Sequence, residues 1–338
     1  MLHRTLLSIL LAAAVGQAAP CSAKAAEAPA ESDARLGEEH FVFLRAGVIV
    51  KAVGGDCVRL VARAPVPFDW PEQTVAISEQ EVSPLVKKLS YRMIDGAARQ
   101  MIVEIPHLPE GAEARAIVTF EVHRRVQIAP EDTAEYLAPS VRQLGRDARP
   151  WLKPSPGTPS DDPQIQQLSR QIVGDDAVAW EQVQAIHQWV IDNIEYQFDE
   201  TLRGAADALK SGHGDCEEMT SLFIALCRAS KVPARTVWVP GHCYPEFYLA
   251  DKSGRGQWFP CEATGPGAFG GTPEVRPILQ KGDNFPDPQT RGGRTRYLHG
   301  TLQGLPAKNS AGRPTLQIVL EVVGGPIGDA ATAPPDVK

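Results

Sequence analysis

The chain has 338 residues, of which 43% are hydrophobic and 22% are charged, an ordinary balance for a globular protein with a buried core. Its formal net charge is −7, and this acidic balance argues against nucleic acid as a partner. The length allows one large domain or two ordinary ones.

The first 25 residues have the order of a secretory signal peptide. His3 and Arg4 precede a short apolar run at 6–15, and small residues around Ala25 form an A-x-A-like cleavage site. The run is too short to span a bilayer, and no later stretch is long and apolar enough for a membrane helix. We therefore expect residues 1–25 to be removed and the protein to be exported to the periplasm or the extracellular space. The mature chain should hold no integral membrane segment.

Export changes how the cysteines are interpreted. Cleavage would remove Cys21 and leave Cys57, Cys216, Cys227, Cys243 and Cys261. An odd number of cysteines in an oxidising compartment implies at least one thiol that is free or paired with another chain. The sequence has no C-x-x-C pair, so a structural zinc site has little support, and we expect neither a metal ion nor a cofactor.

Residues 38–145 are predicted to form a β-rich N-terminal domain. Segments rich in Val, Ile, Phe and Tyr are separated by turn residues such as Gly54-Gly55-Asp56. Several short strands without a helical period favour a β-sandwich. The predicted strands are 41–53, 57–64, 74–77, 88–93, 101–105 and 114–126.

Prolines in the segment 145–163 indicate a linker, after which helical signals begin. Asp162 and Pro163 are typical of a helix N-cap followed by proline at the first helical position. A second helix is predicted from apolar residues at helical spacing in 183–194. A third helix is predicted to start near Asp215 and to end shortly before Pro233.

Three strand-like segments follow, at 234–239, 242–249 and 257–262. The rest of the sequence is rich in Gly and Pro, with one good strand at 315–323. We assign residues 160–325 to an α+β core with a C-terminal extension. Residues 326–338 are expected to be a disordered tail.

Cys216 lies where a glycine-containing loop gives way to the third predicted helix. A thiol at a helix N-terminus meets unpaired amides and the positive end of the helix dipole, and both favour the thiolate. Asp215, Glu217 and Glu218 oppose this effect, because negative neighbours raise the pKa of a thiol. A Cys216 thiolate therefore needs a cationic partner, most naturally an imidazolium.

His242 is the best candidate for that partner, and Glu262 is the best candidate for a carboxylate beside it. The two flank a predicted hairpin whose polar loop has Lys252 at its centre. In that register His242 faces Glu262, where a carboxylate can orient the ring and stabilise its charged form. Pro245 within the strand makes a bulge or an edge position plausible.

The same register places Cys243 opposite Cys261 on the other face of the hairpin. Two facing cysteines in an exported protein can form a cross-strand disulfide, provided that they meet tight geometric limits. They can equally be a pair of small hydrophobic residues under the core. The sequence leaves both interpretations open.

Three motifs in this order resemble those of the bacterial transglutaminase-like family, over about residues 165–265. The first is a G-D-C-E helix start followed by a turn like G-I-P-A-R, here Gly214-Asp215-Cys216-Glu217 and Val232-Pro233-Ala234-Arg235. The second is an H-x-W-x-E-x-Y strand, here His242, Tyr244, Glu246 and Tyr248, with Tyr in place of Trp. The third is a W-x-P-x-D-x-T segment, here Trp258 to Thr264.

The resemblance implies a papain-like α+β core preceded by a β-sandwich domain. It implies Cys216 as nucleophile, His242 as general base and acid, and Glu262 as the residue that orients His242. Glu262 departs from the pattern, because the family usually has Asp there, although Glu serves this role in other triads. The backbone N–H of Cys216 is the expected oxyanion donor, and Gln197 is the candidate for the second donor.

This constellation predicts an acyl-transfer enzyme that acts on amide bonds of a protein or peptide substrate through a thioester. Resolution by water would make it a protease or amidase, and resolution by an amine would make it a transglutaminase. We favour hydrolysis, since nothing in the sequence marks an amine-binding tunnel. The alternative is a non-catalytic module on the same fold that binds a peptide or a cell-wall ligand.

Overall fold

The computed structural model describes residues 35–174, 179–199, 201, 203–265, 267–287 and 290–324. The predicted signal peptide and the predicted C-terminal tail lie outside the described residues. Within those residues, no helix has the length and hydropathy that crossing a membrane requires.

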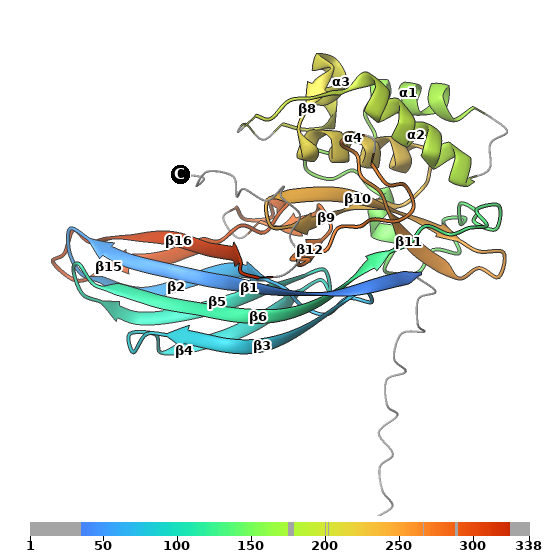
Figure 1. Ribbon diagram of the computed structural model, residues 1–338. Helices are drawn as coiled ribbons and strands as arrows, with labels where there is room; N and C mark the ends of the chain where they lie inside the picture. The colour runs from blue at the N-terminus through green and yellow to red at the C-terminus, as the bar shows by residue number, and fades with distance from the viewer. Residues whose placement is uncertain are drawn as a thin grey trace, which may run out of the picture. The chain divides into compact units, whose positions relative to one another are not determined.

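Strands dominate the first part of the described chain (Figure 1). They are β1 (Leu36–Val53), β2 (Cys57–Val66), β3 (Gln73–Val82), β4 (Lys88–Ile94), β5 (Ala98–Leu108) and β6 (Glu113–Gln127). One antiparallel sheet has the order β16-β1-β6-β3, and β2, β4 and β5 belong to a second sheet. The predicted β-rich N-terminal region is therefore confirmed.

The hydrophobic core of this region lies between the two sheets. Alternate residues of β1, including Leu44, Ala46 and Val48, are fully buried against β2 and β5, as the period of two in a strand requires. Gly47 faces the other way, and a Cβ there would lie 2.1 Å from the carbonyl oxygen of Ala116 on β6. The close approach of β1 and β6 therefore requires glycine at this position.

The last two strands of the described chain pair with the first two. β15 (Thr301–Pro306) lies beside β2, and β16 (Arg313–Val322) lies beside β1 along ten consecutive residue pairs. The sequence grouped these segments with the core as a C-terminal extension, whereas their hydrogen bonds join them to the two N-terminal sheets. The domain boundaries themselves stay a prediction.

The second sheet continues from the N-terminal region into the core. Its order is β11-β10-β9-β12-β5-β2-β15, with β4 also on β5. The added strands are β9 (Ala234–Val239), β10 (His242–Ala250), β11 (Gly256–Pro260) and β12 (Gln280–Lys281). Gln280 joins the two regions, because it pairs with Ala98 on one side and with Trp238 on the other.

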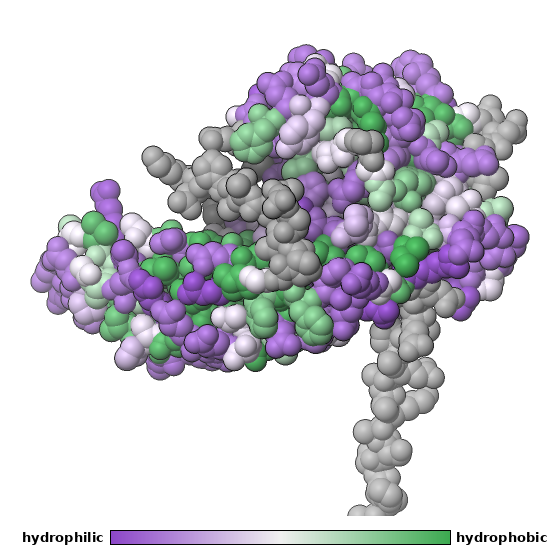
Figure 2. Space-filling model, viewed as in Figure 1, coloured by the Kyte–Doolittle hydropathy of each residue, from purple (hydrophilic) through white to green (hydrophobic). Residues whose placement is uncertain are grey.

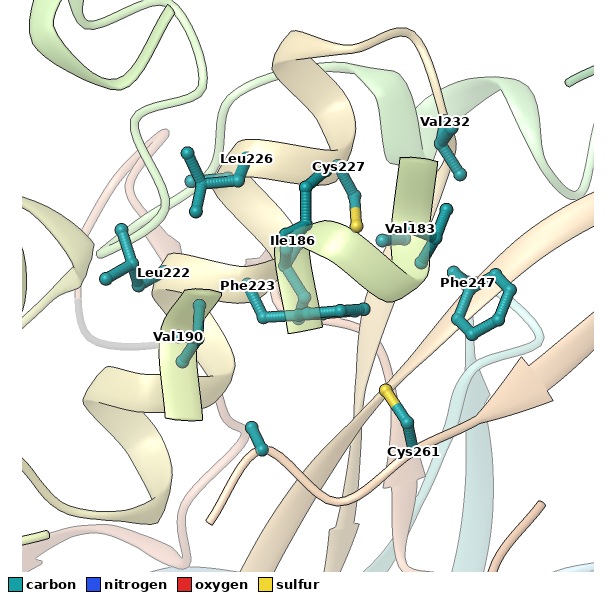
Figure 3. Packing of buried hydrophobic residues seen from close by; sticks show 14 of the residues in the cluster. Val183, Ile186, Val190, Leu222, Phe223, Leu226, Cys227, Val232, Phe247 and Cys261 are labelled. Carbon is teal, nitrogen blue, oxygen red and sulfur yellow. The ribbon is translucent and has the colours of Figure 1, made fainter. Parts of the chain in front are cut away.

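Helices pack on one face of β9 and β10, which confirms the mixed α+β core. They are α1 (Pro163–Val173), α2 (Ala179–Asn193), α3 (Ala205–Ser211) and α4 (Cys216–Ala229), after a short 3-10 turn η1 (Arg149–Leu152). Figure 3 shows Val183 of α2 and Phe223 of α4 against Phe247 of β10. The predicted cap of α1 is confirmed, since the Asp162 side chain accepts from the amides of Gln164 and Ile165.

Short strand pairs complete the described chain, β7 (Glu195–Tyr196) with β8 (His213–Gly214) and β13 (Phe285–Pro286) with β14 (Arg294–Thr295). In the view of Figure 2, hydrophilic side chains cover most of the helical layer, and hydrophobic ones are more frequent over the β-sandwich. Phe41, Ile77 and Met93 are among the exposed hydrophobic residues there.

Two buried ion networks tie the core to its surroundings. Nη2 of Arg228 in α4 donates to both carboxylate oxygens of Asp283, at 2.9 and 2.8 Å, and both side chains are almost fully buried. The Lys281 ammonium lies 2.6 Å from Glu72 and 2.9 Å from Glu246 of β10. Each charge is thus paired, as burial of an ionised group demands.

Candidate active site

Cys216 is the first residue of α4, and a capping box fixes where the helix starts. The Asp215 carboxylate accepts from the amide of Glu217 at 2.8 Å, and the Glu218 carboxylate accepts from the amide of Asp215 at 3.0 Å. A Cβ on Gly214 would lie 2.6 Å from the Cβ of Glu218, so glycine is needed just before the cap. The half-buried Cys216 thus meets the unpaired amides of the first turn.

His242 is the first residue of β10, directly after a tight turn from β9. Gly241 has a φ of 70°, a value that favours glycine, and His242 then pairs with Val239. The side chains of His242 and Cys216 are hydrogen-bonded to each other. Nε2 of His242 lies 3.1 Å from Oε2 of Glu262, which leaves Nδ1 for Cys216.

Glu262 is held at its carboxylate and at its backbone. Its Oε1 accepts from the Thr272 hydroxyl at 3.2 Å, while Oε2 faces His242. Its carbonyl accepts from Nε2 of the buried His187 at 2.6 Å. Neither Thr272 nor His187 belongs to the motifs that predicted this site. His187 lies on the apolar face of α2, beside Ile186 and Val190. A histidine on that face is the feature of the sequence that could have indicated its buried role.

The predicted hairpin register is wrong by two residues, although the two side chains do meet. Ala250 pairs with Gly256 and Glu246 with Pro260, so the loop is centred on Ser253. Asp251 sets this loop, because its carboxylate accepts from the amides of Ser253 and Arg255.

Glu262 consequently lies beyond the last ladder pair, and its side chain reaches back to His242. Pro245 pairs with Thr236 of β9 without a bulge, so the expected bulge is absent, whereas on its other side β11 has ended and the position is a local edge. The Pro245 carbonyl accepts from the amide of Cys261, on the side facing β11. The missing N–H points to that same side, where β11 has just ended at Pro260.

The shifted register also separates Cys243 from Cys261. Cys261 packs in the core beneath the helices (Figure 3). Its backbone lies opposite Pro245 rather than Cys243, because its amide donates to the Pro245 carbonyl. Cys243 instead directs its sulfur toward the start of α4, where Sγ lies 3.5 Å from the carbonyl oxygen of Cys216. The five cysteines in the described part of the chain are all free thiols, so a directly opposed Cys243–Cys261 disulfide is not formed.

The surroundings of Cys216 favour its ionised form. A hydrogen bond from the Cys243 side chain, followed by the hydrogen bond and the charge of His242, lowers the pKa of Cys216 to about 4. Burial opposes the charged form of His242, but hydrogen bonds to Cys216 and Glu262 outweigh burial and raise the pKa of His242 to about 9. A thiolate–imidazolium pair therefore persists between these two values.

Acidic neighbours oppose this ion pair less than the sequence indicated. Burial and a hydrogen bond with Glu218 raise the pKa of Asp215 to about 8. Burial raises the pKa of Glu217 to about 7, although Arg296 lies 3.4 Å away. Both shifts favour the neutral acids and reduce the negative charge around Cys216, whereas the pKa of Glu218 is lowered by its hydrogen bonds, so that this carboxylate keeps its charge.

The segment after α2 also approaches Cys216. The backbone N–H of Gln197 donates to the Gly214 carbonyl at 2.9 Å, and the Gln197 side chain is exposed. Its role as second oxyanion donor stays a prediction. Tyr196, which no sequence motif indicated, borders the site. Its side chain is 54% exposed, and the partial burial of its hydroxyl together with the charges of Cys216 and Asp215 raises its pKa.

Comparison with known proteins defines the class of this domain. Residues 166–263 match the family model described as the transglutaminase-like superfamily. This part of the chain is therefore a transglutaminase-like superfamily domain, as its motifs predicted.

Two individual proteins extend that comparison. An uncharacterized protein of Haemophilus influenzae is 25% identical over 133 residues, which are 37% of this chain and 35% of that protein. The chain thus spans about a third of the length of this curated relative. A candidate cysteine protease of Cytophaga hutchinsonii is 19% identical, with a TM-score of 0.57 over 86% of this chain and 92% of that one. At that identity the likeness concerns the fold.

Proposed function

We propose that this protein is an exported cysteine-dependent acyl-transfer enzyme that cleaves amide bonds in peptides or proteins. The observation that carries the proposal is the hydrogen-bonded series Cys216–His242–Glu262, with Cys216 at a helix N-terminus and its pKa lowered to about 4. A binding module on this fold needs no ionised thiol in that position.

Each residue of this series has a defined role in the proposed reaction. The Cys216 thiolate attacks the amide carbon, and the backbone N–H of Cys216 donates to the developing oxyanion. His242, as imidazolium, gives its proton to the leaving nitrogen, so that the amine departs and a thioester remains. Neutral His242 then takes a proton from water, and the resulting attack releases the acid and regenerates the thiolate. Glu262 holds the ring in place throughout.

Hydrolysis is the proposed outcome rather than cross-linking. Cys216 is not fully buried, so water can reach a thioester formed there. A transglutaminase would have to exclude that water while it admits an amine. The candidate cysteine protease of Cytophaga hutchinsonii shares this fold, so the fold is compatible with hydrolysis.

The test combines labelling with product analysis. A small thiol-directed electrophile should label Cys216 at pH values well below 7, and this labelling should require His242. A glutamine-containing peptide library should yield free acids and amines with the wild type and nothing with Cys216→Ala. An added primary amine should appear in few products. Binding of peptides without turnover by both proteins would instead identify a non-catalytic module.

Export is tested separately from catalysis. N-terminal sequencing of the protein recovered from a periplasmic or culture fraction should begin at Ala26. An intact N-terminus in the cytoplasmic fraction alone would contradict this part of the proposal.

A further inference from the structure

We propose that Cys216 and Cys243 form a peroxide-sensitive dithiol site, in which oxidation of Cys216 is resolved by Cys243 as a reversible disulfide. This inference rests on the proposed function only in its consequence, since a disulfide would withdraw the nucleophile. The site itself is argued from the contacts of the two thiols.

The Cys243 side chain lies against Cys216. Its Sγ is 3.5 Å from the carbonyl oxygen of Cys216, and the charge of Cys216 acts on the Cys243 thiol. A disulfide needs the two sulfurs at about 2.05 Å, so they must approach each other for the bond to form. Cys216 is half-buried at the first position of α4, where side-chain rotation can supply that movement.

The two thiols differ in the properties that this chemistry needs. Cys216 is reachable from solvent and is held as a thiolate, the form that peroxides oxidise. Cys243 is 1% exposed, and burial together with the neighbouring Cys216 charge raises its pKa, so it stays protonated while Cys216 is ionised. Peroxide should therefore react first at Cys216.

The reaction balances with a peroxide as the oxidant. The Cys216 thiolate attacks hydrogen peroxide and becomes a sulfenic acid, and the departing hydroxide takes the proton of the His242 imidazolium to leave as water. Cys243 sulfur then attacks the Cys216 sulfur, passing its proton to neutral His242. The hydroxyl group leaves with that proton as a second water. The two thiols together lose two electrons, and one peroxide molecule gains them.

The remaining cysteines are placed outside this chemistry. Cys227 and Cys261 lie in the core beneath the helices, and Cys57 lies in the β-sandwich core. All three are fully buried, and burial raises the pKa of each. They serve as internal controls for the site.

The experiment treats the full chain with hydrogen peroxide and maps its peptides without reduction. Trypsin leaves Cys216 and Cys227 in one peptide, and further cleavage after Glu217 or Glu218 separates them. We expect one linked pair, Cys216 with Cys243, formed as activity is lost and opened by dithiothreitol as activity returns. Cys261→Ala should behave as the wild type.

Cys243→Ser supplies the decisive contrast. Without a resolving thiol, Cys216 should proceed to sulfinic acid, which dithiothreitol does not reduce. After excess peroxide followed by dithiothreitol, each protein should recover a fraction of its own starting activity. That fraction should be about tenfold smaller for the variant than for the wild type. Equal recovery would overturn the proposal. So would a Cys216 sulfenic acid that dimedone traps in the wild type while Cys243 remains alkylatable. A linked pair in a protein that hydrolyses no amide would refute the proposed function and support the dithiol site.

Discussion

The Glu262 carboxylate lies 3.1 Å from the His242 imidazole, although the hairpin ladder ends at Pro260, before the two residues could pair. The contact depends on side-chain length. It also depends on Thr272, which holds the other carboxylate oxygen at 3.2 Å.

Substitution of Glu262 tests this contact. Glu262→Gln should lower kcat/KM by roughly 10²-fold, because a neutral amide stabilises the His242 imidazolium less than a carboxylate does. The alkaline limb of the pH–rate profile should move to lower pH, since the Glu262 charge helps to raise the pKa of His242. Thr272→Val is the matched control, which keeps the carboxylate and should cost much less. A profile unchanged in Glu262→Gln would show that the Glu262 charge does not stabilise the His242 imidazolium.

The pH dependence of Cys216 alkylation follows from the two shifted groups. The pKa of Cys216 is lowered to about 4, so the thiolate should be lost only as the pH falls through that value. The pKa of His242 is raised to about 9, so its charge is lost as the pH rises through that value. Alkylation by iodoacetamide should therefore persist at pH 5. In His242→Ala it should fall away well above that pH, because the charge and hydrogen bond of His242 are gone. Equal rates in the two proteins at pH 5 would argue against the ion pair.

Arg228 should contribute more to stability than an exposed arginine does. Arg228→Met leaves the buried Asp283 without its partner, and we expect the free energy of unfolding to fall by about 3–5 kcal/mol. Arg45→Met removes an exposed pair with Glu321 and should cost less than about 1 kcal/mol. Urea denaturation of the variants measures both. Similar losses would mean that burial of the Arg228 pair has no energetic consequence.

The buried carboxylate of Glu72 should make the free energy of unfolding depend on pH in the acidic range. Burial would raise its pKa, but Lys281 and Arg124 lower it from 4.5 to about 2. A depressed pKa means stabilisation that is present above 4.5 and is lost as the pH falls through about 2. In Lys281→Met that contribution should shrink or reverse, because the Glu72 charge loses its closest cation. Denaturation midpoints across this range test the sign, with Lys88→Met as an exposed control.

Local features of this protein could be predicted from the sequence, because each depends on a few adjacent residues. The Asp162 cap and the start of α4 at Cys216 are of this kind. The hairpin also predicts that the side chains of His242 and Glu262 lie close together, although the predicted register of its two strands is incorrect. The hydrogen bonds of Asp251 moved the loop centre by one residue, and side-chain reach compensated.

Features set by tertiary packing could not be predicted. The contact of Cys243 with Cys216 arises because α4 lies on β10, and no spacing between the two residues encodes it. His187 and Thr272 converge on Glu262 from a helix and a loop far apart in the chain. The pairing of β16 with β1 likewise joins segments at opposite ends of the described chain.

That last pairing has a consequence for how the polypeptide matures. An emerging chain exposes the free edge of β1 until residues 313–322 are available, and the edge of β2 waits for β15. Loop closures of this length are slow, and open strand edges invite association between chains. The catalytic helices can therefore be complete while the sandwich is still unfinished. A chain that ends soon after Glu262 would keep β1 and β2 but lack β15 and β16, so those edges would stay open, which favours aggregation over a working shortened enzyme.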